Sequence, residues 1–231
     1  MARWIKTFER TATGWGQIFT EGELMKKAIV LGCLVLLFVP MSWAQEKCEA
    51  PLWMTGDKWT FKQADGSTFS LKVMEVRNDL FIVKKEGDPE LYGYNRKTAN
   101  LDFRIKADGS RVKATNDLRK LFDFPISVGK KWTDTTSGLP AQTRVGERQK
   151  AKYFIRFNVE GIEDVTTAAG KFKTYKIRHT LKNMTVLKDR EGWILFWYSP
   201  DAKWWVKQEV EKSSFWPQSR LDTELVSYEL K

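Results

Sequence analysis

Residues 153–160 read Tyr-Phe-Ile-Arg-Phe-Asn-Val-Glu, and this stretch decides the fold class. Tyr153, Ile155, Phe157 and Val159 occupy every second position, and the positions between them are mainly polar. Alternation with a period of two is typical of a β-strand that has one face in the core and the other in water. The stretch therefore predicts a strand of an antiparallel sheet.

The same alternation recurs along the chain after Trp59, and helical periodicity is scarce. Alternating runs at 68–73, 101–106, 175–182 and 204–210 are separated by turn sequences such as those at 107–109 and 199–201. We expect an all-β fold of about ten strands that form a strongly curved antiparallel sheet or partial barrel. At most one short helix is expected, from Asn116 to Phe122, where Asn116 offers an N-cap.

A five-residue pattern occurs twice, and each copy precedes a stretch of predicted strands. Gly-Asp-Lys-Trp-Thr at 56–60 is followed by Gly-Lys-Lys-Trp-Thr at 129–133. Two copies are too few for a solenoid. The pattern predicts two pseudo-repeated β units that share one core, and chance recurrence of a short motif is the alternative.

Residues 25–44 have the order of a secretory signal peptide. Lys26 and Lys27 precede the apolar run 28–39, and Ser42 and Ala44 supply the small residues of a cleavage site. The apolar run is short for a membrane span, which needs about 20 residues. We expect cleavage after Ala44, which leaves residues 45–231 as a single β-rich domain that is soluble and either periplasmic or secreted. A retained membrane anchor is the alternative.

The residues before Met25 do not fit a signal peptide, because its first region is normally short and free of acids. This segment contains Glu21 and Glu23. We interpret residues 1–24 as an extension upstream of a true start at Met25. Residues 30–33 (Val-Leu-Gly-Cys) resemble a lipoprotein cleavage box. The apolar run continues beyond Cys33, which argues against lipidation at this position.

The chain is basic, with 39 Lys and Arg against 29 Asp and Glu and a net charge of +10. This excess favours anionic partners such as lipid head groups or acidic glycans, or else only keeps the surface solvated. Nucleic acid is not an expected partner, because the chain is predicted to be exported and acidic residues are interspersed throughout. Hydrophobic residues make up 42% of the chain, which is enough for a core.

The sequence contains no catalytic, metal or cofactor constellation. His179 is the only histidine and lies on the apolar face of its predicted strand. We expect it to be a buried structural residue with a hydrogen-bond partner. Cys48 is expected near a loose terminus, and a zinc site lacks further ligands. The acidic residues at 160–164 do not have the spacing of a calcium loop. We therefore expect a protein that is not an enzyme and has no cofactor.

Aromatic side chains are concentrated between Trp193 and Trp205. Both faces of the strand 193–198 are apolar, so it is either covered on both sides or exposes an apolar patch to a partner. Strict alternation turns Trp204 into the core and Trp205 outward beside lysines. An exposed Trp among lysines suits a lipid interface or a stacked sugar or base. The alternative is that a loop or the C-terminal segment covers Trp205. The predicted contact residues for a ligand or partner are Trp205, Lys203, Lys207, Trp197 and Tyr198.

Three stretches resemble a family of exported bacterial proteins that is described only as a domain of unknown function. They are 124–132 (Phe-Pro-Ile-Ser-Val-Gly-Lys-Lys-Trp), 163–174 (Glu-Asp-Val-Thr-Thr-Ala-Ala-Gly-Lys-Phe-Lys-Thr) and the stretch from Trp197-Tyr-Ser-Pro-Asp201 to Trp205-Val-Lys207. The resemblance implies a β-rich exported domain. It implies no reaction, no substrate and no functional residues.

These observations favour a non-catalytic envelope protein that binds an apolar or amphiphilic ligand, such as a lipid, or an envelope protein through its curved sheet. The alternative is an assembly or accessory factor that has no small-molecule ligand and acts through its edge strands. A hydrolase is the least favoured class. A deep apolar cavity would favour the ligand-binding protein, whereas a filled core with a bare edge strand would favour the accessory factor.

Overall fold

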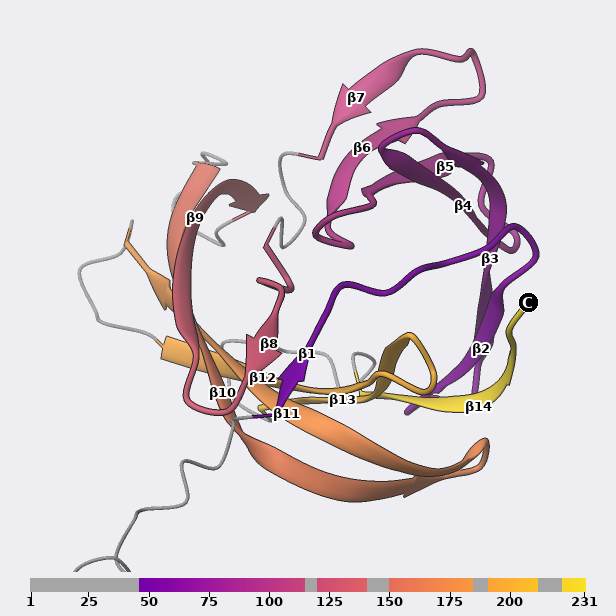
Figure 1. The fold of residues 1–231 in the computed structure, drawn as a ribbon. Helices are drawn as coiled ribbons and strands as arrows, with labels where there is room; N and C mark the ends of the chain where they lie inside the picture. Colours follow the sequence, from indigo (N-terminus) through magenta and orange to yellow (C-terminus); the bar gives the residue numbers. More distant parts are fainter. Residues whose placement is uncertain (1–45, 115–119, 141–149, 185–190, 212–221) are drawn as a thin grey trace, which may run out of the picture. The chain divides into compact units, whose positions relative to one another are not determined.

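A computed structural model of the chain describes residues 46–114, 120–140, 150–184, 191–211 and 222–231 (Figure 1). Residues Gln45–Lys231 form one compact unit. The predicted extension (1–24), the predicted signal peptide (25–44) and most of the predicted helix (116–122) lie outside the described residues. Within the described ranges, no helix is long and apolar enough to span a membrane.

The described residues form fourteen strands, twelve of which belong to one antiparallel sheet in the order β7-β6-β5-β4-β3-β2-β14-β13-β12-β11-β10-β9. The first half contains β2 (Lys58–Gln63), β3 (Thr68–Arg77), β4 (Leu80–Lys85), β5 (Leu91–Asn95), β6 (Leu101–Ile105) and β7 (Arg111–Lys113). The second half contains β9 (Lys131–Pro140), β10 (Lys150–Thr167), β11 (Gly170–Asn183), β12 (Glu191–Ser199), β13 (Trp204–Val210) and β14 (Thr223–Glu229). Two short strands, β1 (Lys47–Cys48) and β8 (Ile126–Ser127), pair with each other. The all-β antiparallel prediction is confirmed, with more strands than the expected ten.

The sheet consists of two meanders of consecutive strands, β2–β7 and β9–β14, that meet where β2 pairs with β14. Each copy of the five-residue pattern begins one meander, and its glycine has a positive φ of 99° at Gly56 and 80° at Gly129. In the first copy Gly56 donates to Val73 (2.8 Å), and Val73 donates back to Asp57 (2.8 Å).

The second copy makes the same pair of backbone hydrogen bonds. Gly129 donates to Val159 (2.8 Å), and Val159 donates back to Lys130 (3.0 Å). Val159 lies in β10, which is bulged directly after it, and β3 is bulged in the same way directly after Val73. The two motif copies therefore occupy equivalent positions in the two meanders.

The main sheet bends round so far that distant strands touch. The rings of Tyr94 in β5 and Trp204 in β13 lie 5.6 Å apart, although β4, β3, β2 and β14 separate these strands in the sheet. In a flat sheet the two strands would lie roughly 24 Å apart, at about 4.8 Å per strand. The edge strands β7 and β9 are not paired with each other in the described part of the chain, so the sheet remains open.

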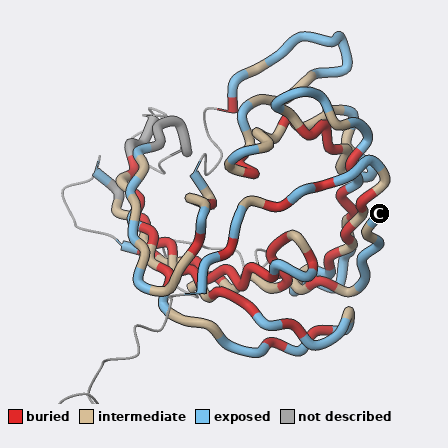
Figure 2. The backbone as a smooth tube through the Cα atoms, in the orientation of Figure 1, coloured by how far each residue is buried: buried red, intermediate tan, exposed pale blue. Residues whose placement is uncertain are grey.

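The segment between β1 and β2 runs across the inside of this bend (Figure 1). Its Trp53 is buried and contacts the rings of Trp59, Phe81, Tyr94 and Trp204 at centroid distances from 4.7 to 5.5 Å. Buried and exposed positions alternate along this segment as they do along the strands (Figure 2). A piece of the chain itself thus occupies the centre of the concave face.

The hairpin of β10 and β11 forms a second layer over the sheet. A bulge after Val159 bends β10. In the sheet, β12 and β13 lie between β11 and β14, yet the distal part of the hairpin reaches β14. The backbone of Ala168 donates to the carboxylate of Glu224 (2.9 Å), and the Phe172 ring lies 5.6 Å from that of Tyr228. One side of β12 and β13 is therefore covered by the hairpin.

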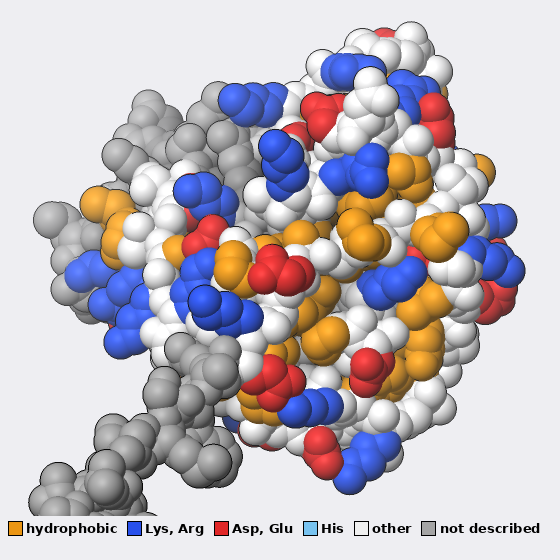
Figure 3. Space-filling view, in the orientation of Figure 1, with side chains coloured by type: hydrophobic (Ala, Val, Ile, Leu, Met, Phe, Trp, Pro, Cys, Tyr) orange, Lys and Arg blue, Asp and Glu red, His pale blue; other side chains and the backbone are white. Residues whose placement is uncertain are grey.

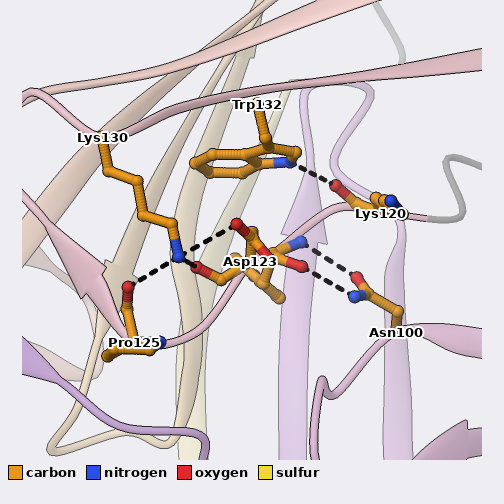
Figure 4. A network of polar contacts seen from close by, with 7 residues as sticks. Asn100, Lys120, Asp123, Pro125, Lys130 and Trp132 are labelled. Carbon is orange, nitrogen blue, oxygen red and sulfur yellow. Dashed lines mark hydrogen bonds and ion pairs between the residues drawn. The ribbon is translucent and has the colours of Figure 1, made fainter.

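A polar network fixes residues 120–125, which lie between the two meanders (Figure 4). The side-chain amide of Asn100 donates to the carbonyl of Phe122 (2.7 Å) and accepts from its N–H (2.9 Å). Lys130 pairs with the carboxylate of Asp123 (2.9 Å), and the indole N–H of Trp132 donates to the carbonyl of Lys120 (2.9 Å). The connecting segment is thereby attached to both halves of the sheet.

We expect Trp53→Ala to destabilise the domain by about 3–5 kcal/mol, because it removes the largest side chain at the centre of the core. Met54→Ala is the matched control. Its side chain is 52% exposed, so the change should stay within about 0.5 kcal/mol. Urea unfolding of both variants checks this. Equal losses would show that the segment does not hold the core.

Candidate binding surfaces

The structure does not bring the five predicted contact residues together. Trp205 and Tyr198 are buried, with exposed fractions of 8% and 1%. Lys203 lies in the turn that precedes β13, where it forms an ion pair. Trp197 and Lys207 contact each other on another face of β12 and β13. The five residues therefore do not form one ligand-contact surface.

The prediction that Trp205 points outward is wrong, and the cause is a bulge in β13. Tyr198 lies opposite Trp205, and Trp197 lies opposite Lys207, so Val206 is an extra residue between them. An extra residue reverses the alternation of side chains on either side of it. Trp205 consequently shares a face with Tyr198 and stacks near Phe61, at a centroid distance of 4.2 Å. Trp204 is buried as well.

The turn 200–203 is held by three side chains from the N-terminal part of the domain. The indoles of Trp53 and Trp59 donate to the carbonyls of Lys203 (2.9 Å) and Ala202 (2.6 Å). The ammonium group of Lys203 lies 3.2 Å from the buried carboxylate of Asp57. The structure therefore assigns Lys203 a structural contact.

Trp197 is covered by charged side chains. Its indole N–H donates to the carboxylate of Glu163, and the ammonium groups of Lys176 and Lys207 lie 5.3 and 4.9 Å from its ring centroid. Cation–π contacts of this kind stabilise a protonated lysine over an indole. Because Trp197 is only 4% exposed, its ring is not available to stack on a ligand. Strand 193–198 is thus covered on both sides, which is the first of the two alternatives that the sequence predicted.

Aromatic side chains from both meanders line the concave side of the sheet. An aromatic row crosses the sheet from β3 to β9, with successive ring centroids from 4.2 to 6.2 Å apart. The row consists of Phe69, Phe61, Trp205, Phe196, His179, Phe157 and Trp132. Five of its seven members are less than 9% exposed. The face predicted to bind a ligand is therefore packed with the protein's own side chains.

His179 is fully buried in this row between the rings of Phe157 (4.4 Å) and Phe196 (4.5 Å). The prediction that it is buried is confirmed, and among the described residues no protein group forms the expected hydrogen bond with either ring nitrogen. Burial disfavours the charged form and lowers the pKa of His179 to about 3. The imidazole is therefore neutral near pH 7 and has no access to a substrate.

Cys48 does not lie on a loose terminus, as the sequence suggested. It pairs with Ile126 through β1 and β8, and it is 7% exposed. Burial, assisted by the nearby charge of Glu49, raises the pKa of its thiol to about 11. The thiol is protonated near neutral pH and is a weak nucleophile. No group of three metal-ligating side chains is present in the described ranges.

Two large apolar side chains project from the segment that fills the bend. Leu52 is 73% exposed and Met54 is 52% exposed, and both flank the buried Trp53. Figure 3 shows hydrophobic side chains gathered over the middle of the face that it draws, with charged side chains among and around them. Sequence reasoning missed these two residues. Residues 51–54 are all apolar, so the sequence gives no sign of which side chains face water.

A second exposed feature is an open groove of about 550 Å³ at the end of the sheet, lined by Asp102, Phe103, Arg111 and Lys113. The Phe103 ring lies flat over Gly93, where a Cβ atom would come within 2.5 Å of the ring carbons. The guanidinium group of Arg111 lies 4.8 Å from the centre of the same ring. Sequence reasoning overlooked this groove, although the short Arg-Val-Lys run after the Asp-Gly turn at 108–109 marks a charged strand.

We expect Trp205→Ala to cost about 3–5 kcal/mol of unfolding free energy, like other buried large-to-small aromatic changes. Trp193→Ala, on the half-buried side of β12 beneath Arg178, serves as the control and should cost clearly less. Thermal and urea unfolding of the two variants distinguish them. A small loss of stability in the Trp205 variant, together with weakened partner binding, would instead support an outward-facing Trp205.

We expect His179→Leu to reduce the loss of stability in acid. The folded state binds the His179 proton only below about pH 3, whereas the unfolded chain binds it below about 6.5. The stability that this group contributes is therefore lost as the pH falls from 6.5 towards 3, by about 2 kcal/mol at pH 5. Urea unfolding at pH 7.5 and pH 5 should show a smaller pH effect in the variant. An unchanged difference would contradict the burial of a neutral imidazole.

The solved structures that resemble this chain include three bacterial proteins of low sequence identity. The hypothetical lipoprotein YmcC from Escherichia coli (K12) has a TM-score of 0.43 and 10% identity, over 77% of this chain and 85% of that chain. A candidate lipoprotein from Parabacteroides distasonis has a TM-score of 0.40 and 14% identity, over 80% and 100%.

A candidate exported protein with a YmcC-like fold from Bacteroides fragilis has a TM-score of 0.37 and 15% identity, again over 80% and 100%. No family model and no curated protein matches the chain. All three neighbours are thus described as lipoproteins or exported proteins, and at these TM-scores they carry no functional argument.

Proposed function

We propose that the domain is a non-catalytic protein of the bacterial envelope, periplasmic or secreted, that binds a macromolecular partner through its outer surface. The observation that carries this proposal is the filled concave face. Trp53 lies at its centre, and the aromatic row lines it from β3 to β9. A curved sheet that holds a small ligand needs a cavity where these side chains lie. Export rests on the signal-peptide pattern at residues 25–44.

A binding role fits the chemistry of the side chains better than a hydrolytic role. The one histidine of the chain is neutral and enclosed by phenyl rings. The thiol of Cys48 is buried and protonated. A histidine that acts as a general base, or a cysteine that acts as a nucleophile, must lie at a surface that a substrate reaches. The exposed features are instead an apolar ridge at Leu52 and Met54 and a charged sheet edge.

A second candidate function is the storage of an amphiphile inside the sheet. Buried polar atoms that have no hydrogen-bond partner among the described residues favour it. They include the side-chain oxygens of Tyr175, Ser199 and Thr223 and the nitrogens of His179 and Trp204. Unpaired buried polar groups are costly, and a bound ligand or water can satisfy them. We rank this candidate second, because the same region is densely packed with aromatic rings.

Native mass spectrometry of the chain purified from its own envelope fraction tests the two candidates. We expect the mass of the protein, alone or with a second protein chain, and no added lipid mass. Delipidation should leave the melting temperature unchanged, because nothing is removed from the core. A stoichiometric lipid that raises the melting temperature when it is restored would replace the proposed function by the second candidate.

A further inference from the structure

The strand β7 ends the main sheet and pairs only with β6 in the described part of the chain. Figure 1 shows no described segment beyond it. Its register with β6 is fixed by hydrogen bonds from Lys106 to Ser110 (2.9 Å) and from Ala114 to Asp102 (3.0 Å). In an antiparallel pair, residues that exchange hydrogen bonds alternate with residues that do not. Val112 therefore bonds to β6, whereas the backbone groups of Arg111 and Lys113 point away from it.

The side chains of this edge are cationic and exposed. Arg111 and Lys113 are two residues apart, so they project from the same face of β7. The ion pairs of the described residues include neither of them. Both line the groove, together with the Phe103 ring that Gly93 supports from below. Two unpaired cations thus flank the open hydrogen-bonding groups of the strand.

We propose that β7 is a docking edge for an extended acidic segment of a partner protein, which adds one strand to the sheet. Residues of the added strand opposite Arg111 and Lys113 would be acidic and two residues apart, and the residue between them, opposite Val112, would be apolar. Strand addition supplies backbone hydrogen bonds, and alternate side chains supply specificity. The inference rests on the proposed function, since it names the class of partner that this surface takes.

Cationic residues on edge strands also occur simply to prevent unwanted pairing. That role repels cationic strands and discourages neutral ones, but it does not exclude an acidic strand. Opposite charges directly across a strand pair attract each other, so this edge selects for carboxylates. The two roles therefore differ in one measurable property, the preference for an acidic over a basic strand.

Binding of capped seven-residue peptides to the purified full chain tests the proposal. The probes are an alternating glutamate–valine peptide, an alternating lysine–valine peptide, and two versions of the acidic peptide N-methylated either at every glutamate or at every valine. We expect the acidic peptide to bind, the lysine peptide not to bind, and methylation at glutamate to abolish binding, because those amides face β7. Methylation at valine should be tolerated. Absence of binding by the acidic peptide, or equal binding by the lysine peptide, overturns the proposal.

Two variants at Lys113 separate the contribution of the backbone hydrogen bond to peptide binding from the contribution of the charge. Lys113→Pro removes the outward N–H without breaking a bond to β6, and Lys113→Gln removes only the charge. We expect the affinity to fall by about tenfold or more with proline and by less with glutamine, with weaker salt dependence for glutamine. The double reversal Arg111→Glu with Lys113→Glu should prefer the lysine peptide. Unchanged affinity in a folded Lys113→Pro variant excludes strand addition at this edge.

Photocrosslinking in cells separates failure of this inference from failure of the proposed function. A photoreactive residue replaces Lys113 in one variant and Leu52 in a second variant. Crosslinks to the same envelope protein from Lys113, lost with Arg111→Glu, support the docking edge. Crosslinks from Leu52 alone overturn the docking edge and leave the proposed function standing. Crosslinks to protein from neither position contradict both.

Discussion

The buried carboxylate of Asp57 joins three parts of the chain that are far apart in sequence. It accepts hydrogen bonds from the backbone N–H groups of Met54 (2.9 Å) and Lys231 (2.7 Å), and it pairs with the ammonium group of Lys203 (3.2 Å). Its exposed fraction is 0%. A buried charge is tolerated only when it is paired and hydrogen-bonded, so these contacts are obligatory once Asp57 is inside. The N-terminal segment, the turn before β13 and the C-terminus are therefore fixed relative to one another, and Trp53 is held at the centre of the bend.

Local pattern in the sequence determines most of the strands but not the faces that they present. The alternation at 153–160 corresponds to β10, and the buried positions are the predicted ones as far as Val159. The bulge at Val206 depends on how β13 pairs with β12, which is a property of two strands and not of one. For this reason the orientation of Trp205 could not be predicted from its own neighbours. The cation–π cover of Trp197 by Lys176 likewise needs the register of β11 against β12.

The filling of the concave face was also beyond the reach of the sequence. Residues 51–54 are all apolar, so the sequence does not show that Trp53 turns inward while its neighbours turn outward. The inward position depends on contacts with distant residues, such as the hydrogen bond from the Trp53 indole to the carbonyl of Lys203. Its neighbours Leu52 and Met54 are turned outward by the same constraint. The open antiparallel sheet is therefore strongly bent, and its own chain places Trp53 inside the bend. For this reason the proposed function assigns binding to the surface and the edges of the sheet.

An open sheet has two edges, here β7 and β9, and their outward backbone groups have different surroundings. At β9 the N–H of Thr135 is satisfied by the neighbouring carboxylate of Asp134 (2.8 Å), so part of this edge is already occupied by a side chain. At β7 the outward backbone groups belong to Arg111 and Lys113, and the only contact of the Arg111 guanidinium in the described residues is with the Phe103 ring. A side-chain carboxylate that satisfies its own edge competes with an incoming strand, whereas a guanidinium on an aromatic ring keeps its donors available. The asymmetry between the edges, and not their mere existence, is what makes β7 the more favourable place for strand addition.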